Sequence, residues 1–143
     1  MSQSFYDQVG GDAFFSALVE GFYTQVRDDD LIGPMYPHDD WEGAELRLKW
    51  FLAQYWGGPP TFNEQRGAPM LRRRHFAFEI GEPEAQRWLE LMHNSLESLE
   101  VSTEHRAALW NHMVRVVAMM INQPGLGSLR LTCVSGRNRS YRK

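Results

Sequence analysis

One stretch of the sequence brings together a histidine, a run of arginines and two aromatic rings. It reads Gln65-Arg66-Gly67-Ala68-Pro69-Met70-Leu71-Arg72-Arg73-Arg74-His75-Phe76-Ala77-Phe78. Pro69 suits the first turn of a short helix, because its ring fixes a helical φ and its missing N–H would have no partner there. His75 would then lie at the end of that helix. An imidazole can ligate a metal and guanidinium groups pair with carboxylates, so the stretch predicts a ligand that carries a metal and anionic groups.

Haem offers this combination, with one iron atom and two propionates. The alternative is that His75 is a surface or satisfied core residue, and that Arg72, Arg73 and Arg74 form a solvated face. The stretch alone leaves both interpretations open, so the elements that surround it must decide between them.

The composition is that of one ordinary globular domain. The chain has 143 residues, of which 43% are hydrophobic and 23% charged, and an aromatic content of 13% requires a core or a cofactor pocket. Cys133 is the only cysteine, which excludes a disulfide framework or a multi-cysteine zinc site within one chain and fits the cytoplasm. The N-terminal residues lack a signal-peptide pattern, and the apolar run over residues 116–121 is far shorter than the ~20 residues of a membrane helix. We therefore expect a cytoplasmic protein with no membrane partner.

Charge is distributed unevenly along the chain. The net charge is −3, and residues 125–143 hold five basic residues and no acidic one, so residues 1–124 carry −8. An acidic body argues against nucleic acid as the main partner. We expect a globular domain over residues 1–124 and a basic, Gly/Ser-containing tail over residues 125–143 that is poorly ordered.

Hydrophobic spacing predicts an all-helical domain with four substantial helices and two or three short ones. Apolar residues recur at intervals of three and four, and no run alternates for long enough to form a strand. The four apolar faces are Phe15, Leu18, Val19, Phe22 and Val26; Ala44, Leu48, Phe51, Leu52 and Tyr55; Ala85, Trp88, Leu89, Met92, Leu96 and Leu99; and Leu109, Trp110, Met113, Val116, Val117, Met120 and Ile121.

Glycine, proline and capping residues predict where these helices begin and end. Residues 57–68 are rich in Gly and Pro and predict a long loop, which would suit the rim of a pocket. The other predicted boundaries are Gly10-Gly11 after a short helix over residues 5–9, a cap at Asp12, a capping box from Asp39 to Glu42, Pro83 at the start of the third helix, a cap at Ser102 or Thr103, and Pro124-Gly125 at the end of the last helix.

Several separated motifs follow one another in a particular order. They are two Gly-Gly turns that flank a pair of helices, Tyr55-Trp56-Gly57-Gly58-Pro59, Glu64-Gln65-Arg66-Gly67 and Leu71-Arg72-Arg73-Arg74-His75. Together they resemble the truncated haemoglobins, and most closely group II of that family, over about residues 4–123. The resemblance implies a shortened globin in which two pairs of antiparallel helices sandwich haem b, with its iron.

The resemblance also implies roles for particular residues. His75 corresponds to the proximal ligand of the iron, Arg74 to a propionate partner and Arg47 to a residue at the haem edge. The chain departs from the family at Phe62, where relatives have a Tyr that contacts a propionate, and at Ala68, where a His is common. The remaining positions of the haem pocket match Tyr23, Tyr36, Ala44, Leu48, Phe51 and Trp88.

Three of these residues could donate hydrogen bonds to a ligand on the haem. Tyr23 and Tyr36 offer O–H groups and Trp88 an N–H, whereas Ala44 is small and cannot donate. Donors in an otherwise apolar haem pocket favour O₂, so we expect Tyr23, Tyr36 and Trp88 to carry any catalytic role. The alternative for each ring is ordinary core packing, although a buried Tyr or Trp still needs a hydrogen-bond partner.

The other histidines show no metal-ligand pattern. His105 and His112 are seven positions apart, hence about 10 Å apart along a helix, which is too far to share a metal. We expect both to be surface groups, and His38 and His93 to face solvent. A catalytic pair of cysteine and histidine is not expected either, because Cys133 lies in the tail.

The sequence therefore favours a haem protein that binds O₂ and other diatomic ligands such as NO and CO. Two or three donors predict slow O₂ release, which suits an oxygen store or a catalyst better than oxygen transport. Redox activity of the NO dioxygenase or peroxidase type would need peroxide or a reductase as a partner, and a homo-oligomer stays open. The competing hypothesis is a helical interaction or sensor module that kept a globin shape without using haem for catalysis.

Overall fold

The computed structural model describes residues 3–70, 75 and 80–122, and every regular element in this part of the chain is helical. The all-α prediction is therefore confirmed. The predicted division into a domain over residues 1–124 and a disordered tail stays a prediction, because residues 123–143 lie outside the described part. The elements are α1 (Phe5–Val9), α2 (Gly11–Val26), the 3-10 helix η1 (Gly33–Met35), α3 (Trp41–Tyr55), α4 (Thr61–Arg66), α6 (Glu82–Glu97) and α7 (Thr103–Met120).

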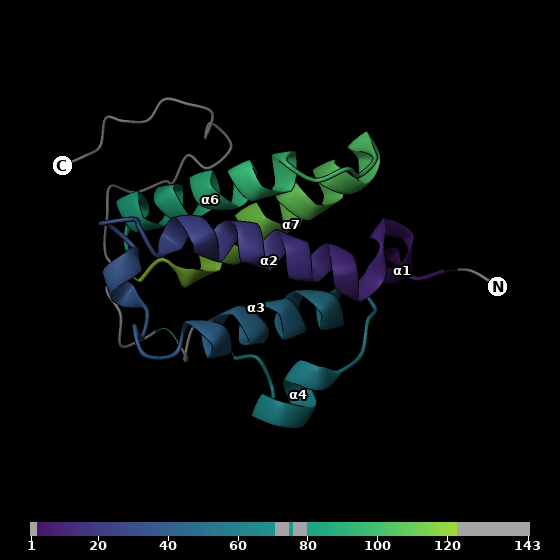
Figure 1. The fold of residues 1–143 in the computed structure, drawn as a ribbon, viewed down its shortest axis with the longest axis horizontal. Coiled ribbons are helices and arrows are strands. Elements are labelled where there is room, and N and C mark those ends of the chain that lie inside the picture. The colour runs from purple at the N-terminus through teal and green to yellow at the C-terminus, as the bar shows by residue number, and fades with distance from the viewer. Residues whose placement is uncertain (1–2, 71–74, 76–79, 123–143) are drawn as a thin grey trace.

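Helix α2 lies in the middle of the molecule and packs against two neighbours. Figure 1 shows α3 along one side of α2 and α6 along the other, with α7 beside α6. Helix α4 is attached to α3. The pair α2 and α3 and the pair α6 and α7 thus form the two layers that the 2-on-2 prediction requires.

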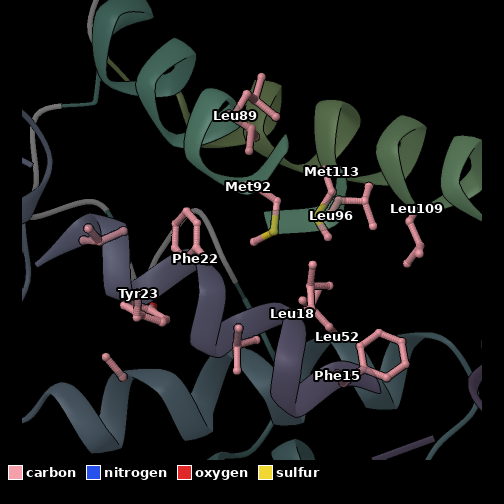
Figure 2. Packing of buried hydrophobic residues seen from close by; sticks show 14 of the residues in the cluster. Phe15, Leu18, Phe22, Tyr23, Leu52, Leu89, Met92, Leu96, Leu109 and Met113 are labelled. Atoms are coloured by element: carbon pink, nitrogen blue, oxygen red, sulfur yellow. The ribbon is translucent and has the colours of Figure 1, made fainter. Parts of the chain in front are cut away.

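The core lies between these layers and consists of the predicted apolar faces. Figure 2 shows Phe15, Leu18 and Phe22 of α2 directed toward the neighbouring helices, with Leu89, Met92 and Leu96 of α6 facing them. Each of these six side chains is at most 1% exposed. Burial of one such side chain stabilises the fold by roughly 1.5–3 kcal/mol, so the α2–α6 contact is a main source of stability.

The helix starts differ from the predictions at two places. The cap of α3 is Asp40 and not Asp39, because the Asp40 carboxylate accepts the backbone N–H of Gly43 at 3.2 Å. Asp12 does not cap α2, since that helix already begins at Gly11, after Gly10 with φ +121°, a conformation that only glycine adopts without strain. The prediction for α7 is confirmed at Ser102, whose hydroxyl accepts the N–H of His105 at 3.0 Å.

Residues 57–68 are not the continuous loop that their composition predicts. They contain α4, which is fixed to α3 by a paired contact: Gln54 accepts the backbone N–H of Asn63 at 2.9 Å and donates to the Asn63 side chain at 3.0 Å. The ring of Phe62 also packs against Phe51, with centroids 5.8 Å apart. These tertiary contacts stabilise a helix of six residues that would be too short to persist alone.

No helix within residues 3–70 and 80–122 is both long enough and apolar enough to span a bilayer.

Candidate functional site

A cavity of about 370 Å³ lies among α2, α3, α4, α6, α7 and the segment that contains His75. Most of its wall is apolar, and its polar groups stand at a few positions. The apolar lining includes Ile32, Met35, Leu48, Phe51, Leu52, Phe62, Ile80, Val116 and Val117. Such a cavity, apolar with a few convergent polar side chains, is the usual form of a cofactor site.

The cavity gathers the residues that the sequence assigned to a haem site. Eight of the nine predicted residues line it, although they come from three helices and two connecting segments. Arg74, the ninth, lies outside the described residues, so its predicted contact with a propionate stays a prediction. The eight are Tyr23, Tyr36, Ala44, Arg47, Leu48, Phe51, His75 and Trp88.

Tyr23, Tyr36 and Trp88 converge on one region of the cavity. The rings of Tyr23 and Tyr36 meet edge to face with centroids 5.5 Å apart, and Tyr23 is only 4% exposed. Burial raises the pKa of Tyr36 to about 12, while hydrogen bonding from Trp88 and then from Tyr23 acts in the opposite direction. Burial likewise raises the pKa of Tyr23 well above its usual range, with a further contribution from Tyr36. Both phenols are therefore neutral at pH 7 and keep their O–H groups as donors.

Local structure explains why these three side chains meet. Tyr23 follows Phe22 in α2, so the two rings point to different sides of the helix, Phe22 toward α6 and Tyr23 toward α3 (Figure 2). Phe22 packs on Trp88 with centroids 4.8 Å apart, which fixes the indole from the core side. Tyr36 directly follows η1 and packs on Trp41, the first residue of α3, at 5.8 Å.

His75 lines the cavity from the segment before α6. Its backbone carbonyl accepts a hydrogen bond from the side chain of Asn122 at 3.3 Å, and the same side chain accepts the N–H of Ile80 at 2.9 Å. The N–H of Asn122 in turn donates to the carbonyl of Ile80 at 2.8 Å. Asn122, two residues after α7, therefore holds the backbone on which His75 is presented, a contact that the sequence did not predict.

Within the part of the chain that the structure describes, two guanidinium groups line the cavity. Arg47 pairs with Asp40 at 3.2 Å, so its side chain is held on the face of α3 that the sequence predicted. Arg66, at the end of α4, lines the cavity as well. Arg66 belongs to one of the sequence motifs, but it had no predicted role. A loop over residues 57–68 does not define where the Arg66 side chain points.

His112 is not the surface residue that the sequence analysis expected. It is 4% exposed and lines the cavity from α7. Its position three residues after Leu109 and four before Val116 places it on the apolar stripe, and this spacing was the signal that could have identified it. His38 and His93 are exposed as predicted, while His105 is partly buried against the ring of Phe5.

The residues present fit a haem. The described ranges contain no group of three or more His, Cys, Asp or Glu side chains able to bind a metal ion, whereas the cavity offers the imidazole of His75, a largely apolar wall and the guanidinium groups of Arg47 and Arg66. A porphyrin needs these features, because its faces are apolar, its iron takes one protein nitrogen and its propionates are anionic. When bound, the haem iron supplies reversible binding of diatomic ligands and one-electron chemistry.

The fold and the cavity together define a haem-binding helical protein, and sequence comparison gives its class. The model of the bacterial-like globins matches residues 4–122, and the chain belongs to this family. The chain is 37% identical over 126 residues to the group 2 truncated hemoglobin YjbI of Bacillus subtilis. The aligned region covers 86% of this chain and 94% of that protein.

Two solved structures support the same assignment. A thermostable hemoglobin from the actinobacterium Thermobifida fusca has a TM-score of 0.84 and 42% identity, and the match covers 86% of this chain and all of that one. A truncated oxygen-avid haemoglobin from Bacillus subtilis has a TM-score of 0.79 and 33% identity over 84% of this chain and 100% of that one. The predicted 2-on-2 globin fold and relation to group II truncated haemoglobins are confirmed. Haem is the cofactor, and the protein binds diatomic ligands such as O₂ through it.

Proposed function

We propose that this protein holds O₂ on a haem bound by His75 and releases it slowly, because Tyr23, Tyr36 and Trp88 donate hydrogen bonds on the distal side. One observation carries the proposal: these three donors and the single imidazole of the His75 segment line the same largely apolar cavity. Ala44, Leu48 and Phe51 would contact the porphyrin. Arg47 would pair with a propionate. The same role for Arg74 rests only on the resemblance of the sequence to the family.

We also propose redox activity of the NO dioxygenase or peroxidase type, with NO or peroxide as the second substrate and an unidentified reductase as a partner. Slow O₂ release supports this role, since a ligand that stays bound has time to react, and it argues against oxygen transport. The relative described as oxygen-avid supports the same interpretation. The single cysteine, Cys133, supports a reducing compartment such as the cytoplasm.

His75→Gly tests the assignment of the iron ligand. We expect the purified variant to lose stable haem retention, because the imidazole is the proposed protein bond to iron, and added imidazole should restore the ferrous absorption spectrum. His93→Gly is the matched control, since His93 is exposed and does not line the cavity. An unchanged ferrous spectrum in His75→Gly would show that another residue binds the iron.

Rapid mixing of the O₂-loaded protein with NO tests the redox activity. Stoichiometric formation of nitrate faster than spontaneous O₂ release would support a dioxygenase role, and turnover of peroxide with a reducing dye would support a peroxidase role. A protein that reacts with neither would be an O₂ store. A purified protein that stays colourless after haem supplementation would instead support the competing interaction module.

A further inference from the structure

Two buried ring nitrogens near the cavity have no hydrogen-bond partner within the described part of the chain. They are Nε2 of His112 and Nε1 of Trp56. Buried polar atoms in folded proteins almost always have a partner, either a protein group or an ordered molecule. Two such exceptions on rings that touch each other therefore point to an ordered molecule that bonds to both.

The two rings are close together and held in place by their neighbours. The rings of His112 and Trp56 meet edge to face with centroids 5.4 Å apart. Tyr55 stacks on the ring of His112, at 3.8 Å and 18°, and Phe5 stacks on Trp56, at 4.0 Å and 30°. This packing prevents either nitrogen from turning toward solvent to find a partner.

This cluster lies at the opposite end of α3 from the proposed distal donors. Trp41, the first residue of α3, packs against Tyr23 and Tyr36, whereas Tyr55, its last residue, packs against His112. A helix of 15 residues is about 20 Å long at ~1.5 Å per residue. The unpartnered nitrogens therefore belong to a region distinct from the ligand-binding side of the cavity.

The chemistry of the two groups defines which molecule can form a hydrogen bond with both nitrogens. An indole N–H only donates a hydrogen bond, and a neutral imidazole has one nitrogen that accepts. His112 is neutral at pH 7, because burial, and to a smaller extent the nearby Arg115, lowers its pKa to about 4. Tyr55 at the end of α3 and Trp56, which follows it, face the His112 ring. A hydroxylic molecule satisfies both groups, since its oxygen accepts from the indole and its O–H donates to the imidazole.

We propose that His112 and Trp56 form a second polar subsite at this end of the haem cavity, in which a water molecule accepts a hydrogen bond from Trp56 and donates one to His112. Water is the occupant because both groups are uncharged and one small molecule can accept a hydrogen bond from one and donate to the other. Tyr55 is 53% exposed and stacks directly on His112, so the subsite lies one aromatic ring below the surface. The subsite gives the cavity a protic group at the end remote from Tyr23, Tyr36 and Trp88, and it does not depend on the roles proposed for those three residues.

Nuclear magnetic resonance on the haem-loaded full chain, in its diamagnetic ferrous carbon monoxide complex, tests the proposal. We expect a cross-peak between the indole N–H of Trp56 and water, with the sign of a long-lived bound molecule, and we expect it to disappear in His112→Phe. The phenylalanine ring keeps the stack on Tyr55 but cannot accept a hydrogen bond. His112→Gln keeps a polar group at the site and should retain the cross-peak, so the comparison remains possible if His112→Phe does not fold.

The pair His93 and Trp110 provides the matched control. Its rings meet in a similar edge-to-face arrangement, with centroids 5.1 Å apart, but His93 is exposed. His93→Phe should therefore leave the Trp56 cross-peak unchanged. A missing Trp56 cross-peak in the unsubstituted protein overturns the proposal, as does one that persists unchanged in His112→Phe. A crystal structure in which both nitrogens bond to protein atoms would also overturn it.

Discussion

A core-packing role and a distal hydrogen-bonding role of Trp88 predict different effects of substitution. Its indole packs on Phe22 in the core and also lines the cavity, as Tyr36 does. A residue that only packs contributes its ring volume, whereas a distal donor contributes its N–H. The two contributions are separated by a substitution that keeps the ring and removes the donor.

Trp88→Phe should raise the O₂ dissociation rate by about 10-fold or more, which corresponds to ~1.4 kcal/mol for one lost hydrogen bond. Release of CO, a weaker hydrogen-bond acceptor, should change less, and the free energy of unfolding should change only modestly. Stopped-flow measurement of both dissociation rates provides the comparison. Trp110→Phe is the control, because Trp110 does not line the cavity. Equal changes for the two ligands would leave Trp88 as a packing residue and transfer the distal role to Tyr23 and Tyr36.

His112 makes stability depend on pH over a defined range. Its pKa is lowered from about 6.5 to about 4 by burial and by Arg115, so between these values the unfolded chain binds a proton that the folded chain does not. The free energy of unfolding should therefore fall as the pH is lowered from 6.5 to 4, by up to roughly 3 kcal/mol from this residue. This contribution is constant above pH 6.5 and below pH 4.

Urea unfolding of the unsubstituted protein and of His112→Phe at several pH values measures this effect. The variant lacks the titrating group. Its free energy of unfolding, relative to that of the unsubstituted protein, should therefore increase as the pH is lowered from 6.5 to 4. Trp110→Phe removes no titrating group and should show no such increase. Parallel pH profiles for the unsubstituted protein and His112→Phe would contradict the explanation.

At the scale of elements, one carboxylate connects the end of α2 with the helix that carries Trp88. Asp29 accepts the backbone N–H groups of Leu31 and Ile32 at 3.0 and 2.9 Å and forms an ion pair with Arg87 at 2.6 Å. Burial alone would raise the pKa of Asp29, but the hydrogen bonds from Ile32, Arg87 and Leu31 lower it overall. The segment leading to Tyr36 is thereby fixed to α6.

Asp29→Asn should destabilise the protein by about 1–3 kcal/mol, because the neutral amide loses the ion pair and offers weaker acceptance to two backbone donors. A double-mutant cycle with Arg87→Met should show a coupling of more than about 0.5 kcal/mol between the two positions. Asp28→Asn is the control, since no ion pair of Asp28 is found among the described residues. Additive effects of Asp29→Asn and Arg87→Met would mean that the ion pair between these two residues does not contribute to the free energy of unfolding.

The elements also show what the sequence could predict. The apolar spacing of α2, α3, α6 and α7 is a local signal, so these helices and the core they form were predictable. Helix α4 was not, because it depends on the contacts of Asn63 with Gln54 and of Phe62 with Phe51, which no periodicity reveals. His75 was predicted from its own stretch of sequence, and the other seven predicted residues that line the cavity came from a family resemblance. Arg66 lay within one of the motifs that carried this resemblance but received no role, whereas His112 lay outside those motifs.

For the whole molecule, the core and the haem cavity adjoin but are not the same region. The most buried contacts of α2 with α6 and α7, such as those of Leu18, Leu96 and Leu109, do not line the cavity, while much of the buried or half-buried face of α3 does. The protein therefore has one part whose packing is complete without haem and another whose apolar surface needs the cofactor to cover it.

Removal of haem should lower the stability of the whole protein but affect its two parts unequally. A cofactor that binds only the folded state stabilises it by about 4 kcal/mol when present at 1,000 times its dissociation constant, so the haem-free protein should unfold at a clearly lower temperature. In hydrogen exchange, amides of α3 should lose most of their protection, whereas those in the centres of α2 and α6 should keep theirs. Reconstitution with haem is the control and should restore both measurements. A uniform loss of protection in all helices would show that the core depends on the cofactor. Identical melting temperatures with and without haem would show that the side chains of the cavity already close it.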